Sequence, residues 1–271
     1  MATAALDLNE KHFNKISELV YQSSGINLKK GKEALVRARL MKRLRAIGMK
    51  SVEDYMQYIE DAEGAHELTS LIDVMTTNKT SFFREVEHFN FLRDTILPEL
   101  DRPRLRFWST ACSSGEEPYS LAVLLRDCIA NIDTKDVLIL ATDISRRMLE
   151  KAHAAVYSEQ MLRTLPRQYQ KKYFTKLDNQ RTGFQRVADD VRKMIRFAWL
   201  NLLDPWPMKG PFNVIFCRNV MIYFDRPTQQ TLINRFWEIL EPGGCLFVGH
   251  SEGLSAIKHN FQYVRPATYR K

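Results

Sequence analysis

Polar and acidic residues follow several predicted strands at the points where these strands end. The segment ACSSGEEPY (residues 111–119) comes after the first such strand, and Pro118 suits the first turn of a helix. Dinucleotide-binding folds carry a GxGxxG loop at this place, whose backbone cradles a pyrophosphate. Here a single glycine, Gly115, precedes two carboxylates, Glu116 and Glu117. Two acidic side chains would repel a pyrophosphate, so the pattern disfavours a nicotinamide cofactor or a nucleoside triphosphate and favours a ligand with positive charge.

S-adenosylmethionine is such a ligand, because it carries an ammonium and a sulfonium group, and Gly115 would let the backbone approach it. The alternative is that Glu116 and Glu117 only complement the dipole of the helix. The second strand ends at Asp143, which is placed to accept hydrogen bonds from two ribose hydroxyls or, alternatively, to cap the next helix. Ligands of open α/β sheets bind beyond the carboxyl ends of the strands, so we favour the ribose interpretation.

Two later strand ends point to the same crevice. In WLNL (199–202), Asn201 is placed to meet the edge of an adenine. The segment FCRNVMIYF (216–224) stands where amino-directed methyltransferases of nucleic acids carry an (Asn/Asp)-Pro-Pro-aromatic element that holds an exocyclic amine. This chain has no such prolines and offers the donors Arg218 and Tyr223 instead, which suit an anionic nucleophile. Tyr223 could equally be an aromatic residue of the core.

The segment before the sheet, MTTNKTSFFRE (75–85), combines several polar side chains with two adjacent phenylalanines. It could close over a ligand between two domains. Alternatively, its aromatic residues only anchor a linker to the larger domain.

The elements that position these residues change in type along the chain. Residues 6–75 predict helices only, because apolar residues recur with a helical period and glycines punctuate the segments; the helices expected are 8–22, 32–47, 52–60 and 65–76. From Leu105 onward, β-branched and aromatic runs alternate with helical patterns, which indicates a doubly wound parallel sheet. The strands expected are 105–111, 137–142, 195–200, 213–217 and 245–249, and the helices are 119–131, 145–155 and 227–240.

Two short segments complete this prediction. Residues 261–264 and 268–270 are too close together for a helical crossover, so they predict an antiparallel hairpin at the edge of the sheet. Residues 173–187 interrupt the alternation and predict an inserted hairpin with a polar tip.

The charge of the chain is unevenly distributed. The 271 residues carry a net charge of +8, and residues 29–50 hold nine basic residues against one acid, whereas residues 51–75 hold seven acids and no Lys or Arg. In the predicted helix 32–47, an apolar stripe faces the interior (Val36, Leu40, Leu44 and Ile47), and a basic face is expected on the opposite side, toward water (Arg39, Lys42 and Arg45). Such a local strip favours docking to an acidic partner over a general nucleic-acid coat, with a merely solvated face as the alternative.

Other functional classes are disfavoured by composition. No apolar run reaches the length of a membrane span, and the first residues show no secretory signal. The four cysteines are scattered without a CxxC pair, which indicates reduced thiols in a cytoplasmic protein. We expect no metal, no nucleic acid and no membrane insertion.

The segments TTNKTSFFRE, ACSSGEEPYS, ATDIS, NLLDPWP, IFCRNVMIYFD and LEPGGCLFVGHSE resemble the chemotaxis receptor methyltransferases, the CheR family. The resemblance covers nearly the whole chain. It implies a small all-α N-terminal domain that docks to receptors (1–76), a linker that contributes to the cofactor site (77–98), and a class I S-adenosylmethionine-dependent methyltransferase domain (99–271). That α/β domain has a Rossmann-like doubly wound sheet with a terminal antiparallel hairpin and a small inserted β-subdomain at about 172–190.

The resemblance also implies an activity and its residues. In the family, S-adenosylmethionine methylates glutamate side chains in the cytoplasmic helical domain of transmembrane chemoreceptors, giving γ-methyl esters and S-adenosylhomocysteine. Arg84 and Tyr223 would lie near the methyl acceptor as catalytic residues. The implied cofactor contacts are Asn78, Thr80, Arg84, Glu117, Asp143, Asn201, Leu202, Arg218 and Asn219.

Some members hold a C-terminal receptor pentapeptide with a glycine-rich tip of the inserted hairpin. The tip expected here, residues 178–183, has a single glycine, which departs from that pattern.

A glutamate acceptor does not require a catalytic nucleophile paired with a general base, and the sequence shows no Ser/His/Asp or Cys/His pattern of that kind. A glutamate with a pKa near 4.3 is already ionised at neutral pH and needs no general base. The triplet His250-Ser251-Glu252 is not preceded by a nucleophile elbow, which disfavours a catalytic triad. Two alternatives remain, a methyltransferase of nucleic acids or small molecules and a non-catalytic cofactor-binding adaptor.

Overall fold

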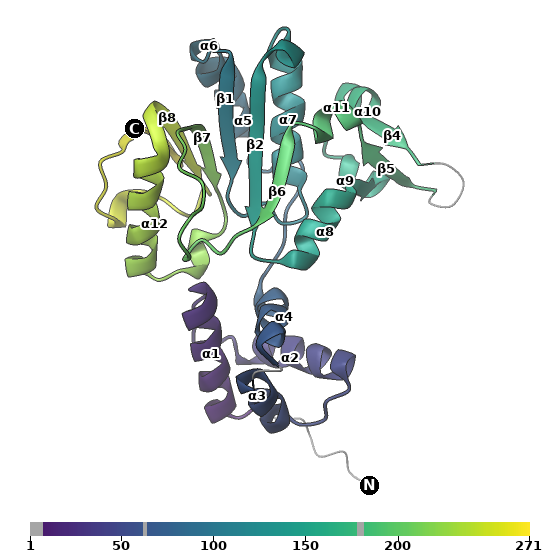
Figure 1. The fold of residues 1–271 in the computed structure, drawn as a ribbon, viewed down its shortest axis with the longest axis vertical. Helices are drawn as coiled ribbons and strands as arrows, with labels where there is room; N and C mark the ends of the chain where they lie inside the picture. Colours follow the sequence, from purple (N-terminus) through teal and green to yellow (C-terminus); the bar gives the residue numbers. More distant parts are fainter. Residues whose placement is uncertain (1–7, 62–63, 178–181) are drawn as a thin grey trace. The chain divides into compact units, whose positions relative to one another are not determined.

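The computed structural model describes residues 8–61, 64–177 and 182–271, and these residues form two compact units (Figure 1). The helical unit contains the described residues up to Thr77 together with Tyr223–Thr228. The sheet unit contains Asn78–Ile222 and Gln229–Lys271. The segment Tyr223–Thr228 therefore belongs to the helical unit, although it lies far along the chain.

The helical unit is built from α1 (Glu10–Ser24), α2 (Glu33–Ile47), α3 (Val52–Glu60) and α4 (Ala65–Met75), each within two residues of the prediction. Local signals set these bounds. The side chains of Asn9 and Ser51 accept hydrogen bonds from N–H groups in the first turns of α1 and α3. Gly25 and Gly48 end α1 and α2 in the left-handed conformation. The apolar faces meet in a core that includes Ile16, Leu40, Leu44, Tyr55 and Leu71.

A buried carboxylate connects three of these helices. Glu67 of α4 accepts two hydrogen bonds from the Arg43 guanidinium of α2 (2.7 and 2.5 Å) and one from the Tyr55 hydroxyl of α3 (2.7 Å). Burial opposes ionisation of Glu67, but the hydrogen bonds from Arg43 and Tyr55 outweigh it, so the pKa of Glu67 lies below its usual value. A charge at this position is therefore fully compensated inside the unit.

The sheet unit is a seven-stranded mixed sheet in the order β6-β2-β1-β7-β8-β10-β9. The pairs among β6, β2, β1, β7 and β8 are parallel, and β10 is antiparallel to both β8 and β9. This topology confirms the predicted doubly wound sheet with a terminal antiparallel hairpin. The strands are β1 (Arg104–Ser109), β2 (Asp136–Asp143), β6 (Ile195–Trp199), β7 (Phe212–Cys217), β8 (Leu240–Val248), β9 (Gln262–Arg265) and β10 (Thr268–Arg270).

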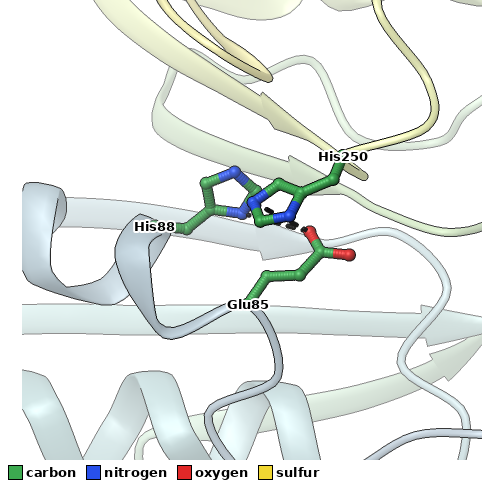
Figure 2. A group of neighbouring side chains, drawn as sticks. All are labelled: Glu85, His88 and His250. Atoms are coloured by element: carbon green, nitrogen blue, oxygen red, sulfur yellow. Dashed lines mark ion pairs between the residues drawn. The ribbon is translucent and has the colours of Figure 1, made fainter.

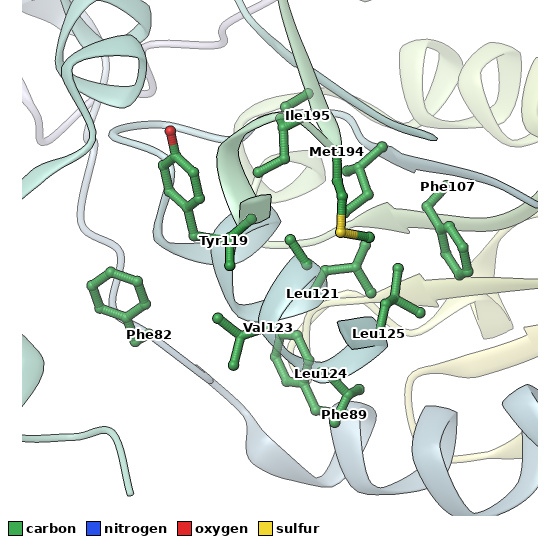
Figure 3. Close-up of a cluster of buried hydrophobic side chains, with 14 of the residues drawn as sticks. Phe82, Phe89, Phe107, Tyr119, Leu121, Val123, Leu124, Leu125, Met194 and Ile195 are labelled. Carbon is green, nitrogen blue, oxygen red and sulfur yellow. The ribbon is translucent and has the colours of Figure 1, made fainter. Parts of the chain in front are cut away.

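Helices cover this sheet and connect its parallel strands. The segment before β1 forms α5 (Val86–Phe91), a π-helical turn (Leu92–Ile96) and α6 (Leu97–Glu99). The crossover helices are α7 (Glu116–Cys128), α8 (Arg146–Ala154) and α12 (Arg226–Ile239), and short 3-10 turns lie at Ile132–Thr134, Met221–Tyr223 and Leu254–Ala256. All six residues of β7 are buried, as expected for a central parallel strand covered on both faces. Figure 3 shows part of the core, where side chains of α7 pack with Phe89, Phe107, Met194 and Ile195.

A second, three-stranded antiparallel sheet is inserted between β2 and β6. Its order is β3-β5-β4, with β3 (Val156–Ser158), β4 (Phe174–Lys176) and β5 (Phe184–Val187). The predicted hairpin is β4 and β5, whereas β3 was not expected. Helices α9 (Glu159–Leu162), α10 (Arg167–Tyr173) and α11 (Asp189–Arg192) flank these strands. Of the hairpin tip, residues 178–181 lie outside the described residues.

Among the described residues, no helix is both long and apolar enough to cross a membrane. The four cysteines are free thiols, with Cys112, Cys217 and Cys245 buried and Cys128 exposed.

Candidate functional site

Gly115 shows why the loop after β1 needs a glycine. Its φ of 97° lies in the left-handed region, and a Cβ there would lie 2.8 Å from the Tyr157 hydroxyl and 2.9 Å from the Ala152 Cβ. The Tyr157 hydroxyl donates to the Ser114 carbonyl (2.7 Å), which holds the loop against α8 and β3. The close approach therefore involves the protein's own side chains, and this packing by itself accounts for the glycine that the sequence suggested would face a ligand.

The two carboxylates after Gly115 have different surroundings. Glu116 is buried and accepts a hydrogen bond from the Ser114 hydroxyl (2.7 Å), and burial raises the pKa of its carboxyl. Glu117 accepts hydrogen bonds from the Ser109 hydroxyl (2.7 Å) and from the Arg218 guanidinium (2.8 Å). Burial raises the pKa of Glu117, and the charge of Arg218 opposes that rise. Glu117 thus links the end of β1 to the loop after β7.

Asp143 connects the ends of β1 and β2. Its Oδ2 accepts a hydrogen bond from the Ser113 N–H (2.7 Å) and its Oδ1 from the Ser145 N–H (2.8 Å). The side chain of Ser145 caps α8 by accepting from the Met148 N–H. Ser145 rather than Asp143 is therefore the cap of α8. Asp143 is a buried carboxylate that bridges the loops after β1 and β2.

Arg218 is the central cation of this region, with a side chain that is only 1% exposed. Its guanidinium contacts Glu117, lies 3.1 Å from Glu85 Oε2, and donates a very short hydrogen bond to the Arg84 carbonyl. Asn219, with a left-handed φ of 58°, donates from its side chain to Glu85 Oε1 (3.2 Å). The loop after β7 is thus tied to α7 and to the segment before α5.

The segment around Arg84 has an uncommon backbone. Phe83 and Glu85, on either side of Arg84, both have positive φ angles of 49° and 54°. Left-handed conformations cost non-glycine residues of order 1–3 kcal/mol and concentrate at functional sites. The Arg84 guanidinium donates to the Lys79 carbonyl (2.8 Å), and the Phe83 N–H donates to the Ser120 hydroxyl of α7 (2.9 Å).

Phe82 provides the aromatic anchor that the sequence offered as the alternative role of residues 75–85. Phe82 is buried and packs edge-on against Tyr157 and Phe174, with ring centroids 4.9 and 5.6 Å apart (Figure 3 labels Phe82). Phe82 therefore anchors the segment to the sheet unit, and the strained, polar residues that follow it lie at the strand ends.

The remaining predicted cofactor residues lie in the same unit. The Asn78 carbonyl accepts from the Ser113 hydroxyl (3.1 Å), and Thr80 is half-buried two residues further on. Asn201 and Leu202 are buried after β6. The Asn201 side chain accepts from the Leu203 N–H and donates to Asp204, each at 3.2 Å, so it also orders the turn in which it lies.

Tyr223 is placed differently, since it belongs to the helical unit. Its carbonyl accepts a hydrogen bond from the Asn27 N–H (2.8 Å), and the nearby Asp225 accepts from the Tyr21 hydroxyl of α1 (2.6 Å). The structure thus groups Arg84 with all predicted cofactor residues in the sheet unit and Tyr223 with the helical unit.

The predicted basic face of α2 needs one correction. Lys42 and Arg45 are exposed, as expected, but Arg39 is half-buried. Its guanidinium donates to the Met75 carbonyl (2.5 Å) and to the Thr77 hydroxyl (2.9 Å), so it caps the carboxyl end of α4 rather than facing water.

Sequence reasoning missed Glu252 as an organising residue. This buried carboxylate accepts from the N–H groups of Asn219 (2.6 Å), Gly249 (2.7 Å) and Ile222 (3.0 Å). A Cβ on Gly249 would lie 2.5 Å from its Oε2, which leaves only glycine for that position. The only signal in the sequence was an acid shortly after the last parallel strand.

The side chains gathered at the strand ends fit S-adenosylmethionine better than a phosphate ligand. Three carboxylates, Glu85, Glu117 and Asp143, gather at the carboxyl ends of the strands, and no glycine-rich phosphate cradle precedes α7 in the described residues. Arg218 offsets part of this negative charge. The site therefore suits a ligand with a ribose and a positive charge.

Comparisons with known proteins agree with this assignment. The family model "CheR methyltransferase, SAM binding domain" matches residues 78–270, and "CheR methyltransferase, all-alpha domain" matches residues 11–76. A chemotaxis protein methyltransferase of Klebsiella aerogenes is 42% identical, covering 97% of this chain and 90% of that protein. Proteins of the same name from Borreliella burgdorferi (39%, covering 98% and 96%) and Escherichia coli (40%, covering 96% and 90%) are similar over nearly their whole length.

Proposed function

Because the chain belongs to the CheR methyltransferase family, we propose that it methylates specific glutamates in the cytoplasmic helical domain of chemoreceptors. It is an S-adenosylmethionine-dependent methyltransferase of chemotaxis, since both family models match and relatives at about 40% identity span nearly the full length. The structural observation that carries the assignment is the cluster of carboxylates at the strand ends, at the place where a phosphate-binding fold would have its glycine-rich loop.

The reaction requires positioning more than acid–base chemistry. S-adenosylmethionine supplies an electrophilic methyl group on a sulfonium. A glutamate acceptor is ionised at neutral pH, so the protein has no proton to remove before the displacement. Charge is lost on both partners as the methyl group moves, so a strong ion pair to the acceptor would stabilise the ground state more than the transition state. The task of the site is therefore to hold the carboxylate and the methyl group at near-attack distance.

Individual roles follow from the positions of the residues. Asp143 would bind the ribose hydroxyls, Glu117 and Arg218 would fix the loops that line the cofactor, and Asn201 with Leu202 would meet the adenine. Asn78, Thr80 and Asn219 would complete the cofactor contacts. Arg84, held in a strained segment, and Tyr223 would act at the acceptor, where a single offset guanidinium and a hydroxyl orient a carboxylate without a tight ion pair.

Docking of the receptor would use the exposed basic residues of α2. Lys42 and Arg45 are exposed, and residues 29–50 contain a single acid to neutralise them. An acidic helical surface around the modified glutamates would be attracted to this face over about a Debye length. Arg39 is half-buried against the end of α4, so it contributes less to docking than the sequence indicated.

A receptor C-terminal peptide would bind at the inserted sheet. A groove of about 320 Å³ lies there, lined by Arg167, Gln170, Lys171, Phe174, Lys176 and Gln185. Its three cationic side chains suit a peptide that ends in a free carboxylate. A free-acid peptide should bind measurably better than the same peptide with an amidated terminus. Equal binding of the two peptides would contradict this part of the proposal.

The decisive experiment is transfer of a labelled methyl group from S-adenosylmethionine to a receptor cytoplasmic fragment. Label that is released by mild base identifies a carboxyl ester, and a fragment with its modified glutamates changed to glutamine is the matched control. Label on nucleic acid or small molecules would support a different methyltransferase. Cofactor binding without any transfer would support a non-catalytic adaptor.

A further inference from the structure

Three potential metal ligands from distant parts of the sheet unit lie together beside α5. Figure 2 shows Glu85 and His88, three residues apart at the start of α5, facing His250 from the loop after β8. One ligand atom from each lies within 4.8 Å of the other two. Glu85 Oε2 is 3.6 Å from His88 Nδ1 and 3.9 Å from His250 Nε2. The sequence shows no metal-binding motif because His250 lies so far along the chain from the other two.

The innermost of these side chains has no hydrogen-bond partner. His88 is 1% exposed, and both of its ring nitrogens are buried without a hydrogen-bond partner, whereas Glu85 Oε2 lies 3.1 Å from the Arg218 guanidinium. Leaving a buried polar atom unsatisfied costs about 1–3 kcal/mol, so native structures rarely do so without a bound water or ion. The two unsatisfied nitrogens of His88, of which Nδ1 lies 3.6 Å from Glu85 Oε2, thus point to a missing ligand.

The charged neighbours of the three groups are themselves paired. Glu85 Oε2 lies 3.1 Å from the Arg218 guanidinium, and Glu85 Oε1 accepts a hydrogen bond from the Asn219 side chain. Arg218 is itself paired with Glu117 (2.8 Å), so it does not cancel the charge of Glu85 alone. The other neighbouring cation, Arg265, is paired with Glu87 (3.8 Å).

We propose that Glu85, His88 and His250 bind one divalent transition-metal ion, with Zn²⁺ as the best fit. Two imidazoles and one carboxylate are borderline ligands that suit zinc, whereas Mg²⁺ and Ca²⁺ prefer oxygen alone. Zinc–ligand bonds of about 2.0–2.1 Å put tetrahedral ligand atoms roughly 3.3 Å apart, so small side-chain rotations would close the present distances. Asn219, which donates to Glu85 Oε1, would orient the carboxylate as an outer ligand.

The solvent side of the cluster gives the ion a route in. The His250 side chain is 53% exposed, in contrast to the buried His88. His250 can therefore be changed with little effect on folding, which makes it the residue on which to test the site.

The test measures metal binding directly and so does not depend on the proposed function. Untagged full-length protein, freed of metal with a chelator that is then removed, is titrated with Zn²⁺ by calorimetry. Co²⁺ is used as a spectroscopic probe, since tetrahedral Co²⁺ absorbs visible light far more strongly than octahedral Co²⁺. We expect one equivalent of each ion and a tetrahedral spectrum. His250→Ala should weaken binding at least tenfold, whereas His153→Ala, which changes an exposed histidine of α8 outside the cluster, should leave it unchanged.

Two results would overturn the proposal. One is the absence of stoichiometric binding by the unchanged protein. The other is equal affinity of the His250→Ala and His153→Ala variants, which would identify surface binding only.

Discussion

At the scale of single residues, the Asp143 carboxylate accepts hydrogen bonds from two backbone N–H groups. The bonds from Ser113 and Ser145 fix its carboxylate at the end of β2. The residue that the sequence indicated as a ribose ligand is thus also part of the framework. This dual role affects how its substitution must be tested.

We expect Asp143→Ala to weaken the binding of S-adenosylhomocysteine. Each hydrogen bond lost between a ribose hydroxyl and an ionised carboxylate should cost about 1.5–3 kcal/mol. Calorimetry measures the affinity, and circular dichroism establishes that the variant is folded. Asp136→Ala is the matched control, because Asp136 is an exposed acid at the opposite end of the same strand. Unchanged affinity in folded Asp143→Ala protein would refute the ribose assignment.

Arg218 provides a second prediction at this scale. Arg218→Met leaves Glu117 and Glu85 without their cation, and removing one partner of a buried ion pair costs about 3–5 kcal/mol. Urea unfolding monitored by tryptophan fluorescence measures this loss, since all four tryptophans lie in the sheet unit. Arg93→Met removes an exposed arginine paired with its neighbour Asp94 and should cost less than about 1 kcal/mol. Similar losses in the two variants would show that the buried network contributes little.

At the scale of elements, Glu67 makes the packing of α2, α3 and α4 depend on pH. Its pKa in the folded chain lies below its usual value of 4.5, so its stabilisation is complete above the unfolded pKa and is lost as the pH falls through the folded pKa. Glu67→Gln should lower the opening free energy of these helices by about 1.5–3 kcal/mol at pH 7. Hydrogen exchange of residues 33–75 measures it, and the difference from the unchanged protein should shrink below about pH 4.5. A difference that is constant from pH 7 to pH 3 would contradict this account.

The basic face of α2 carries a further prediction for elements. Reversing Lys42 and Arg45 to Glu should reduce receptor methylation severalfold at low ionic strength and leave the affinity for S-adenosylhomocysteine unchanged. The effect should diminish as salt screens the attraction. The control reverses two exposed lysines of α1, outside the basic strip 29–50, Lys11 and Lys15. If both pairs of reversals reduce methylation equally, net charge rather than this face is responsible.

At the scale of the whole molecule, cofactor binding should be visible as stabilisation of the sheet unit. Free S-adenosylhomocysteine at 100 times its dissociation constant should add about 2.7 kcal/mol to the free energy of unfolding. NADH at the same concentration should add nothing, because Glu116 and Glu117 occupy the position of a pyrophosphate loop. Chemical unfolding monitored by tryptophan fluorescence compares the two ligands. Stabilisation by NADH would contradict the argument from the carboxylates.

The fold could be predicted from the sequence where one periodic signal dominates. The four N-terminal helices and the five parallel strands show apolar periods of 3.6 residues or continuous buried runs, and glycines such as Gly25 and Gly48 mark the ends of helices. Strand β3 was missed because three residues are too few to establish a period. The strand ends, and hence the candidate site, followed from the same pattern.

Side-chain partners that are distant in the chain could not be predicted. Arg39 lies opposite the apolar stripe of α2, so the helical period placed it in water, yet its partners Met75 and Thr77 come from the end of α4. The packing of Gly115 depends in the same way on Tyr157, and the role of Glu252 depends on backbone N–H groups in two loops. Such contacts depend on how the elements pack in three dimensions, which the spacing of residues along the chain does not indicate.

The segment Tyr223–Thr228 limits how this protein can be recombined. It follows β7 in the chain but is part of the helical unit, where Tyr21 and Asn27 hold it. A fragment that starts at Asn78 would carry this segment without those partners. Exchanging the first 77 residues for those of a homologue would likewise bring in a surface that evolved against a different version of the segment. Chimaeras that aim to redirect receptor choice should therefore transplant residues 223–228 together with the helices.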